Sequence, residues 1–133
     1  MSVFSEYQTD TIDLALDFYG YEDCPKNYEF GPSVRDNFVL HFVTKGKGVF
    51  HFNKKEIHLE AGDLFLLPKN MVTYYQADAE DPWSYYWIGI SGTKVSDFMR
   101  FSTLHEKGFL KKTEVETEKI GQFMERLVHK AEA

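Results

Sequence analysis

The sequence predicts a mainly β domain, a sandwich or barrel of short strands followed by two helices. Between residues 12 and 90, apolar runs that alternate or continue are separated by turn residues roughly every eight to twelve positions, a spacing typical of such folds. Aromatic residues make up 17% of the chain, and aromatic residues favour strands. After residue 92 the apolar spacing changes to that of amphipathic helices.

The first strand is predicted over residues 12–18, where apolar side chains alternate with Asp13, Ala15 and Asp17. Residues 20–33 hold two glycines and two prolines, so we expect a long loop with a short extended piece at residues 28–30. Residues 38–44 and 49–52 flank a Lys-Gly-Lys-Gly turn, which indicates a hairpin.

Four further strands follow, each bounded by turn residues. They are predicted at residues 56–60, 64–67, 71–76 and 84–90. The first helix is indicated by the spacing of Val95, Phe98 and Met99. The second helix carries an apolar stripe formed by Ile120, Phe123, Met124, Leu127 and Val128. It has no terminal glycine or proline, so we expect that a longer native protein continues beyond residue 133, unless the helix frays at a natural end.

The size and charge of the chain exclude several classes of protein. A chain of 133 residues with 43% hydrophobic residues forms one folded domain rather than a disordered tail. No apolar run approaches the roughly 18 residues of a membrane helix, and residues 1–10 do not resemble a signal peptide, so we expect a cytoplasmic protein. The net charge of −6 argues against direct binding to nucleic acid, and the single Cys24 cannot form an internal disulfide.

A metal site is weakly supported. The five histidines never occur as His-x-His; His41 and His51 lie on the two strands of the expected hairpin and could meet, but no third ligand is evident. Residues 62–74 resemble the second motif of the cupin superfamily, with Thr73 at the position of its histidine ligand. Threonine is a poor ligand for transition metals, so the resemblance implies the barrel without the metal.

Catalytic and phosphate-binding motifs are equally weak. The chain has no Gly-x-Ser-x-Gly sequence, and its serines have no evident histidine partner. The acidic runs near residues 80 and 116 are typical of solvated surface, and the Lys-Gly-Lys-Gly segment is better explained as a turn than as a phosphate loop.

The aromatic residues favour a sugar site. Proteins bind sugars by stacking their C–H faces on Trp or Tyr and by directing polar groups at their hydroxyls. Tyr85 and Trp87 are two residues apart and therefore share one face of a strand, although a buried tryptophan in a sheet is more often core than pocket wall. The candidate ligand-binding residues are Arg35, His41, Tyr74, Tyr85 and Trp87.

Five segments together resemble the N-terminal effector domain of AraC-family transcriptional regulators, in the branch that regulates oligosaccharide use. They are residues 20–25, 30–36, 40–48, 62–68 and 81–92, the last with an Asp-Pro-Trp-x-x-x-Trp-Ile-Gly pattern. The resemblance implies a cupin-like jelly-roll barrel over residues 1–92, helices that mediate dimerisation over residues 93–133, and a DNA-binding domain with two helix-turn-helix units that is absent here.

The resemblance also implies roles for single residues. The pocket tyrosine of the arabinose-binding member corresponds to Tyr74, its pocket histidine to Tyr85, and its stacking tryptophan to Trp87. Its arginine falls near Gly31, which cannot replace it, so we expect Arg35 to do so. The residues expected to form a homodimer interface are Ile120, Phe123, Met124 and Leu127, unless this stripe packs on its own barrel.

The leading hypothesis is therefore a non-enzymatic domain that binds a sugar effector, without a metal or cofactor, and dimerises. One alternative is a cupin enzyme such as a sugar isomerase or a metal-dependent oxygenase, which would contain stoichiometric metal. Another is a dimerisation module whose barrel is filled by its own side chains.

Overall fold

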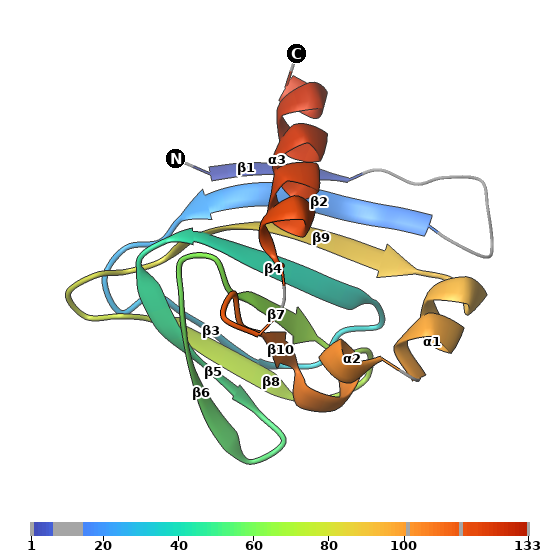
Figure 1. Cartoon of the computed structure of the whole chain (residues 1–133), viewed down its shortest axis with the longest axis horizontal. Helices are drawn as coiled ribbons and strands as arrows, with labels where there is room; N and C mark the ends of the chain where they lie inside the picture. The colour runs from blue at the N-terminus through green and yellow to red at the C-terminus, as the bar shows by residue number, and fades with distance from the viewer. Residues whose placement is uncertain (1, 7–14, 101, 115, 133) are drawn as a thin grey trace.

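Two antiparallel sheets face each other in the computed structural model, which describes residues 2–6, 15–100, 102–114 and 116–132 (Figure 1). Within these residues, one sheet has six strands and the other four. The six-stranded sheet has the order β1 (Ser2–Glu6), β2 (Ala15–Asp23), β9 (Ser84–Ser91), β4 (Phe38–Lys45), β7 (Leu64–Leu67) and β10 (Phe109–Leu110). The four-stranded sheet has the order β3 (Glu29–Ser33), β8 (Thr73–Ala77), β5 (Lys47–Phe52) and β6 (Lys55–Glu60). The prediction of a mainly β fold is confirmed.

The space between the sheets is filled mostly by aromatic side chains, and period-two burial along the strands explains how. In β5, Gly48, Phe50 and Phe52 are buried while Val49 and His51 are partly exposed, so alternate residues face inward. Phe65, on β7, lies centrally and contacts the ring of Trp83 in a stacked arrangement, with centroids 5.1 Å apart. We call this layer the inner core.

The predicted hairpin of residues 38–44 and 49–52 is wrong. β4 pairs with β7 and β9, whereas β5 pairs with β6 and β8 in the other sheet. Gly46 turns the chain between the sheets at a φ of +73°, and a Cβ there would lie 2.3 Å from the carbonyl oxygen of Pro82. His41 and His51 consequently belong to different sheets and do not meet.

The predicted loop over residues 20–33 is wrong at both ends. β2 continues through Asp23, since Gly20 and Glu22 pair with Trp87 and Tyr85 of β9, and β3 extends from Glu29 to Ser33. Ile12 and Leu14, the start of the predicted first strand, lie outside the described residues. Sequence periodicity also missed three short elements: β1, β10 and the one-turn helix α2 (Thr103–Lys107).

The two predicted helices are present as α1 (Thr93–Arg100) and α3 (Glu118–Glu132). Figure 1 shows α3 lying across the outer face of the six-stranded sheet. Met124 and Val128 of α3 are buried there, in a cluster with Leu64, Leu66 and Tyr86 among others that we call the outer core. Among the described residues, no helix is both long and apolar enough to cross a membrane.

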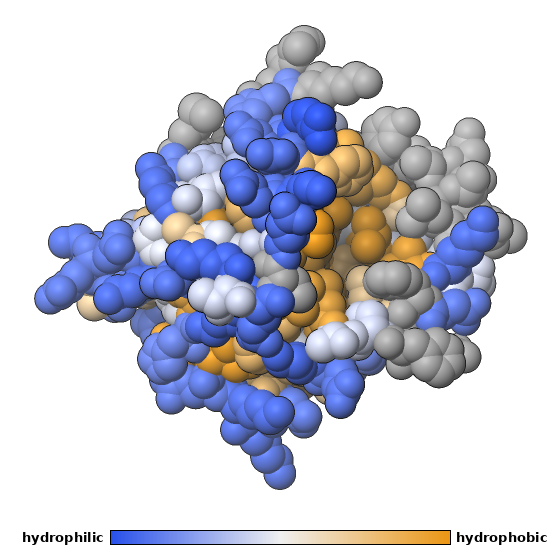
Figure 2. Space-filling view, in the orientation of Figure 1, coloured by the Kyte–Doolittle hydropathy of each residue, from blue (hydrophilic) through white to orange (hydrophobic). Residues whose placement is uncertain are grey.

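The apolar stripe expected at a dimer interface is divided by this packing. Met124 is 0% exposed, and Ile120 and Leu127 pack against the outer core of their own chain, whereas Phe123 is 55% exposed. Figure 2 shows further apolar surface beside α3 over the six-stranded sheet. Most of the stripe therefore stabilises the domain itself, and dimerisation through this face stays a prediction.

Candidate functional site

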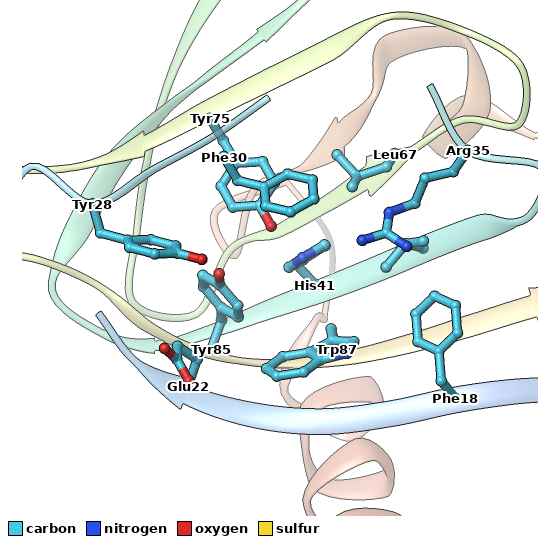
Figure 3. A pocket seen from close by; sticks show the side chains of 11 residues that line it. Phe18, Glu22, Tyr28, Phe30, Arg35, His41, Leu67, Tyr75, Tyr85 and Trp87 are labelled. Atoms are coloured by element: carbon cyan, nitrogen blue, oxygen red, sulfur yellow. The ribbon is translucent and has the colours of Figure 1, made fainter. Parts of the chain in front are cut away.

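A cavity of about 420 Å³ opens from the inner core, between the two sheets. Figure 3 shows the side chains that line it, with Glu22 and Tyr28 at one end, Phe18 and Arg35 at the other, and His41 and Trp87 between. The lining residues are Phe18, Glu22, Tyr28, Phe30, Arg35, Val39, His41, Leu67, Tyr75, Tyr85 and Trp87.

The floor of the cavity comes from three neighbouring strands in register. Trp87 of β9 is paired with His41 of β4 on one side and with Gly20 of β2 on the other. Tyr85, two residues before Trp87, projects from the same face, and the two rings meet edge to face with centroids 5.9 Å apart. Gly20 contributes no side chain to this row of the floor, so its side chains are those of Trp87 and His41.

His41 is held rigidly at the base of the cavity. Its imidazole stacks on Phe65 with centroids 4.3 Å apart and planes 9° apart, and the rings of Tyr75 and Tyr85 meet it edge-on. The side chain is 2% exposed, and its Nδ1 atom has no hydrogen-bond partner among the described residues. Burial, together with the positive charge of Arg35, lowers the pKa of His41 to about 3, so the imidazole is neutral near pH 7.

Arg35 closes the other end of the cavity. Its guanidinium lies over the rings of Phe18 and Phe30, 5.4 and 5.3 Å from their centroids, and so bridges side chains from both sheets. The backbone N–H of Asn70 donates a 2.7 Å hydrogen bond to the carbonyl of Arg35, which fixes the loop. The buried Nε atom of Arg35 has no hydrogen-bond partner among the described residues, which leaves a donor at the cavity.

The phenols at the Glu22 end remain protonated. Burial raises the pKa values of Tyr28, Tyr75 and Tyr85 above their ordinary value, so each hydroxyl can both donate and accept a hydrogen bond. Burial likewise raises the pKa of the Cys24 thiol to about 11. A thiol with so high a pKa is a poor nucleophile at neutral pH, which makes Cys24 part of the core rather than of a reactive site.

Four of the five predicted ligand-binding residues line this one cavity: Arg35, His41, Tyr85 and Trp87. Tyr74 lies on the opposite face of its strand, because its neighbour Tyr75 is the one that points inward. Its ring is 5.1 Å from that of His51, and its hydroxyl donates a 2.5 Å hydrogen bond to Glu29. The structure therefore separates Tyr74 from the other four.

Several lining residues were missed by the sequence analysis. Phe18 and Glu22 both lie on β2, and an alternating pattern continued beyond residue 18 includes Glu22, but the glycine at residue 20 is typical of the start of a loop. Tyr75 points inward and Tyr74 does not, and a run of two tyrosines does not show which of them faces the cavity. Tyr28 and Phe30 join the site only through the packing of the four-stranded sheet.

Metal ligation receives no geometric support in the described part of the chain. No group of three or more His, Cys, Asp or Glu side chains there is placed to hold an ion. Thr73, at the position of the cupin ligand, is buried at the start of β8 and pairs with Ser33 and Phe52 across the sheet.

A family model described as the AraC-like ligand binding domain matches residues 15–133. The chain is 45% identical over 107 residues to the Msm operon regulatory protein of Streptococcus mutans serotype c, covering 80% of this chain and 38% of that protein. It is 41% identical over 100 residues to the raffinose operon transcriptional regulatory protein RafR of Pediococcus pentosaceus, covering 73% of this chain and 36% of that protein. It is 34% identical over 97 residues to the lactose operon transcription activator of Staphylococcus xylosus, covering 73% of this chain and 35% of that protein. The chain thus spans less than two fifths of these relatives.

Solved structures with the same fold are much more distant in sequence. The protein YhaK from Escherichia coli has a TM-score of 0.59 and 13% identity, covering 69% of this chain and 45% of that chain. The cupin domain of Schizosaccharomyces pombe Cnp3 has a TM-score of 0.54 and 12% identity, covering 74% of this chain and 70% of that chain. These similarities show a cupin-like fold and nothing about function.

Proposed function

Because this chain belongs to the family of AraC-like ligand binding domains, we propose that it is the effector-binding part of a longer transcription regulator, with a saccharide as effector. Its relatives bear the names of regulators of the Msm, raffinose and lactose operons, and two of those names are names of saccharides. A saccharide effector for this chain would follow the same pattern.

The observation that supports a saccharide best is the combination of ring walls and unpartnered polar atoms in one cavity. Trp87 offers a flat surface for the C–H face of a pyranose, while the unpartnered Nδ1 of His41 and Nε of Arg35 offer hydrogen bonds to its hydroxyls. Because a buried polar atom without a partner is costly, a ligand that satisfies both atoms gains free energy beyond its stacking.

We propose binding without catalysis at this site. The relatives are named as regulators, and the raised pKa of Cys24 leaves the only thiol of the chain protonated near pH 7. Arg35, His41, Tyr85 and Trp87 would then act only as binding residues, with no metal or cofactor between them and the sugar. Stoichiometric iron, manganese or zinc in the purified protein would instead favour a cupin-type enzyme.

The test is a thermal-shift screen with raffinose, lactose, melibiose, galactose, glucose and arabinose. A sugar that binds only the folded state adds RT ln(1 + [L]/Kd), which is about 2.7 kcal/mol at a hundredfold excess over Kd, and raises the melting temperature by several degrees. Trp87→Ala should abolish this shift. Tyr74→Ala, an aromatic deletion on the opposite face, should retain it.

Two other results would contradict the proposal or part of it. If no sugar in the screen shifts the melting temperature, the saccharide effector is wrong and the dimerisation module becomes the better description. If Tyr74→Ala loses the shift while Trp87→Ala keeps it, the sugar binds near Tyr74, on the opposite face of β8, and not in the cavity.

We further propose that the regulator is a homodimer and that it contacts DNA through a segment outside this chain. Support for the dimer comes from the exposed Phe123 on α3 and from the apolar surface beside that helix (Figure 2). Support for the separate DNA-binding segment comes from the acidic charge of −6 and from the greater length of the relatives.

A further inference from the structure

The cavity has a negatively charged end that no sequence motif indicated. Glu22 lines it from β2, directly opposite Tyr85 in the strand register. Figure 3 shows its carboxylate beside Tyr85 and Tyr28, at the end remote from Arg35. Its charge also contributes to the raised pKa values of Tyr28 and Cys24, which agrees with a position close to both.

The register of β2, β9 and β4 divides the floor into three rows. Glu22, Tyr85 and Val43 form the first row; Gly20, Trp87 and His41 the second; Phe18, Gly89 and Val39 the third. Rows that face the same side are two residues apart, so neighbouring rows are separated by about 6.6 Å and the outer rows by about 13 Å. The guanidinium of Arg35 lies over Phe18, in the third row.

Neither charged end is neutralised within the described part of the chain. Glu22 and Arg35 have no ion-pair partner there, and two row steps separate Glu22 from the row under Arg35. A carboxylate only accepts hydrogen bonds and a guanidinium only donates them. Since every sugar hydroxyl can do both, a neutral saccharide can satisfy both ends, whereas a carboxylate on the part of the ligand at the Glu22 end would meet like charge.

The length of the floor indicates how many rings such a ligand has. One pyranose stacked on Trp87 covers the middle row and lies next to His41 and Arg35. Reaching Glu22 and the hydroxyl of Tyr85 in the first row requires one more row step of about 6.6 Å, which a second ring joined to the first can make. Glu22 is thus placed to contact a second ring rather than the first.

We propose that Glu22 is a specificity-determining residue that accepts hydrogen bonds from the second ring of a neutral disaccharide or longer saccharide. This proposal rests on the saccharide effector proposed above. It explains why the cavity has an acceptor at one end and a donor at the other. Arg35 and Trp87 hold the first ring, and Glu22 selects for saccharides that have a second ring.

Calorimetric titration of the purified protein with raffinose, lactose and their shared component galactose tests the proposal. Glu22→Gln should weaken binding of the longer saccharides about tenfold or more, since hydrogen bonds to charged groups are the stronger ones. The affinity for galactose should be the same in this variant as in the unsubstituted protein, including the case in which neither binds it. Glu22→Asp, which keeps the charge on a shorter side chain, should recover part of the loss.

The matched control is Glu56→Gln, the same substitution at an exposed site on the β6 hairpin, and it should bind like the unsubstituted protein. The melting temperatures of the unliganded variants verify folding. Unchanged binding of raffinose and lactose by Glu22→Gln would overturn the role of Glu22, and an equal loss for galactose would overturn its assignment to a second ring. If the unsubstituted protein binds no saccharide, the proposed function itself fails, and this inference fails with it.

Discussion

The two faces of β9 contribute to two buried regions, of which only one keeps a cavity. Tyr85 and Trp87 point into the inner core, where a cavity remains and polar atoms of His41 and Arg35 lack partners in the described part of the chain. Tyr86 and Ile88 point into the outer core. There Leu64, Leu66 and Met124 are all 0% exposed.

Alternate residues of this one strand therefore have different roles. The inward side chains line the binding cavity, and the outward side chains stabilise the fold. Side chains on the outward face pack against other side chains that are mostly apolar, so they contribute to the free energy of folding. Those on the inward face leave room and unpaired donors, which folding alone does not require. Substitutions on the two faces should therefore affect different measurements.

Met124→Ala should produce the largest loss of stability, because it empties a fully buried site in the outer core. Large-to-small substitutions of this kind cost about 2–5 kcal/mol of unfolding free energy. Chemical denaturation measures this loss, and titration with the sugar that binds best in the screen should give an unchanged Kd below the transition. A weakened Kd without loss of stability would contradict the separation of the two regions.

Acid should destabilise the inner core through His41. The pKa of His41 is lowered to about 3 in the folded protein, against 6.5 for the ordinary group, so below pH 6.5 the unfolded chain binds a proton that the folded protein does not. Stability is then lost as the pH falls from 6.5 toward 3, at up to about 1.4 kcal/mol per pH unit.

Denaturation between pH 7 and 4.5 tests this effect, with His41→Phe as the variant. Phenylalanine preserves the aromatic packing around Phe65 and cannot titrate, so the loss of stability with acid should become smaller. His58→Gln, at an exposed site, should keep the slope of the unsubstituted protein. An identical slope in His41→Phe would show that the imidazole is not the group responsible.

Gly89→Ala should have the smallest effect on stability and a clear effect on binding. A Cβ at residue 89 would lie 2.3 Å from the Phe18 ring, which can move into the adjacent cavity at a cost of about 1 kcal/mol. Phe18 would then occupy ligand space, and the Kd for the sugar should rise. Gly121→Ala crowds the Phe42 ring at 2.3 Å in the outer core, and there only the unfolding free energy should change.

Much of the fold could be predicted because burial follows local periodicity. The alternation in β5 and β6 and the apolar stripe of α3 identified those elements directly. The pairing of strands could not be predicted in the same way. β4 and β5 follow each other through a glycine turn like the strands of a hairpin, and only the second sheet that receives β5 shows that they do not pair.

Part of the site could also be predicted. Tyr85 and Trp87 share a face whatever their strand pairs with, so their association followed from spacing. Arg35, in a loop, was selected for its chemistry, and the structure brings it to the same cavity. Two other features could not be predicted from local spacing. Which of Tyr74 and Tyr75 faces inward depends on the strands that pair with β8, and the continuation of β2 past Gly20 to Glu22 depends on its pairing with β9.

The sequence by itself determined which residues alternate, where helices replace strands and which aromatic and polar groups are available, because these depend on neighbours along the chain. The tertiary structure decided which sheet each strand joins, which tyrosine faces the cavity and that Glu22 and Arg35 stand at its opposite ends. Those outcomes depend on pairing between residues far apart in the chain, and local patterns leave such pairing open.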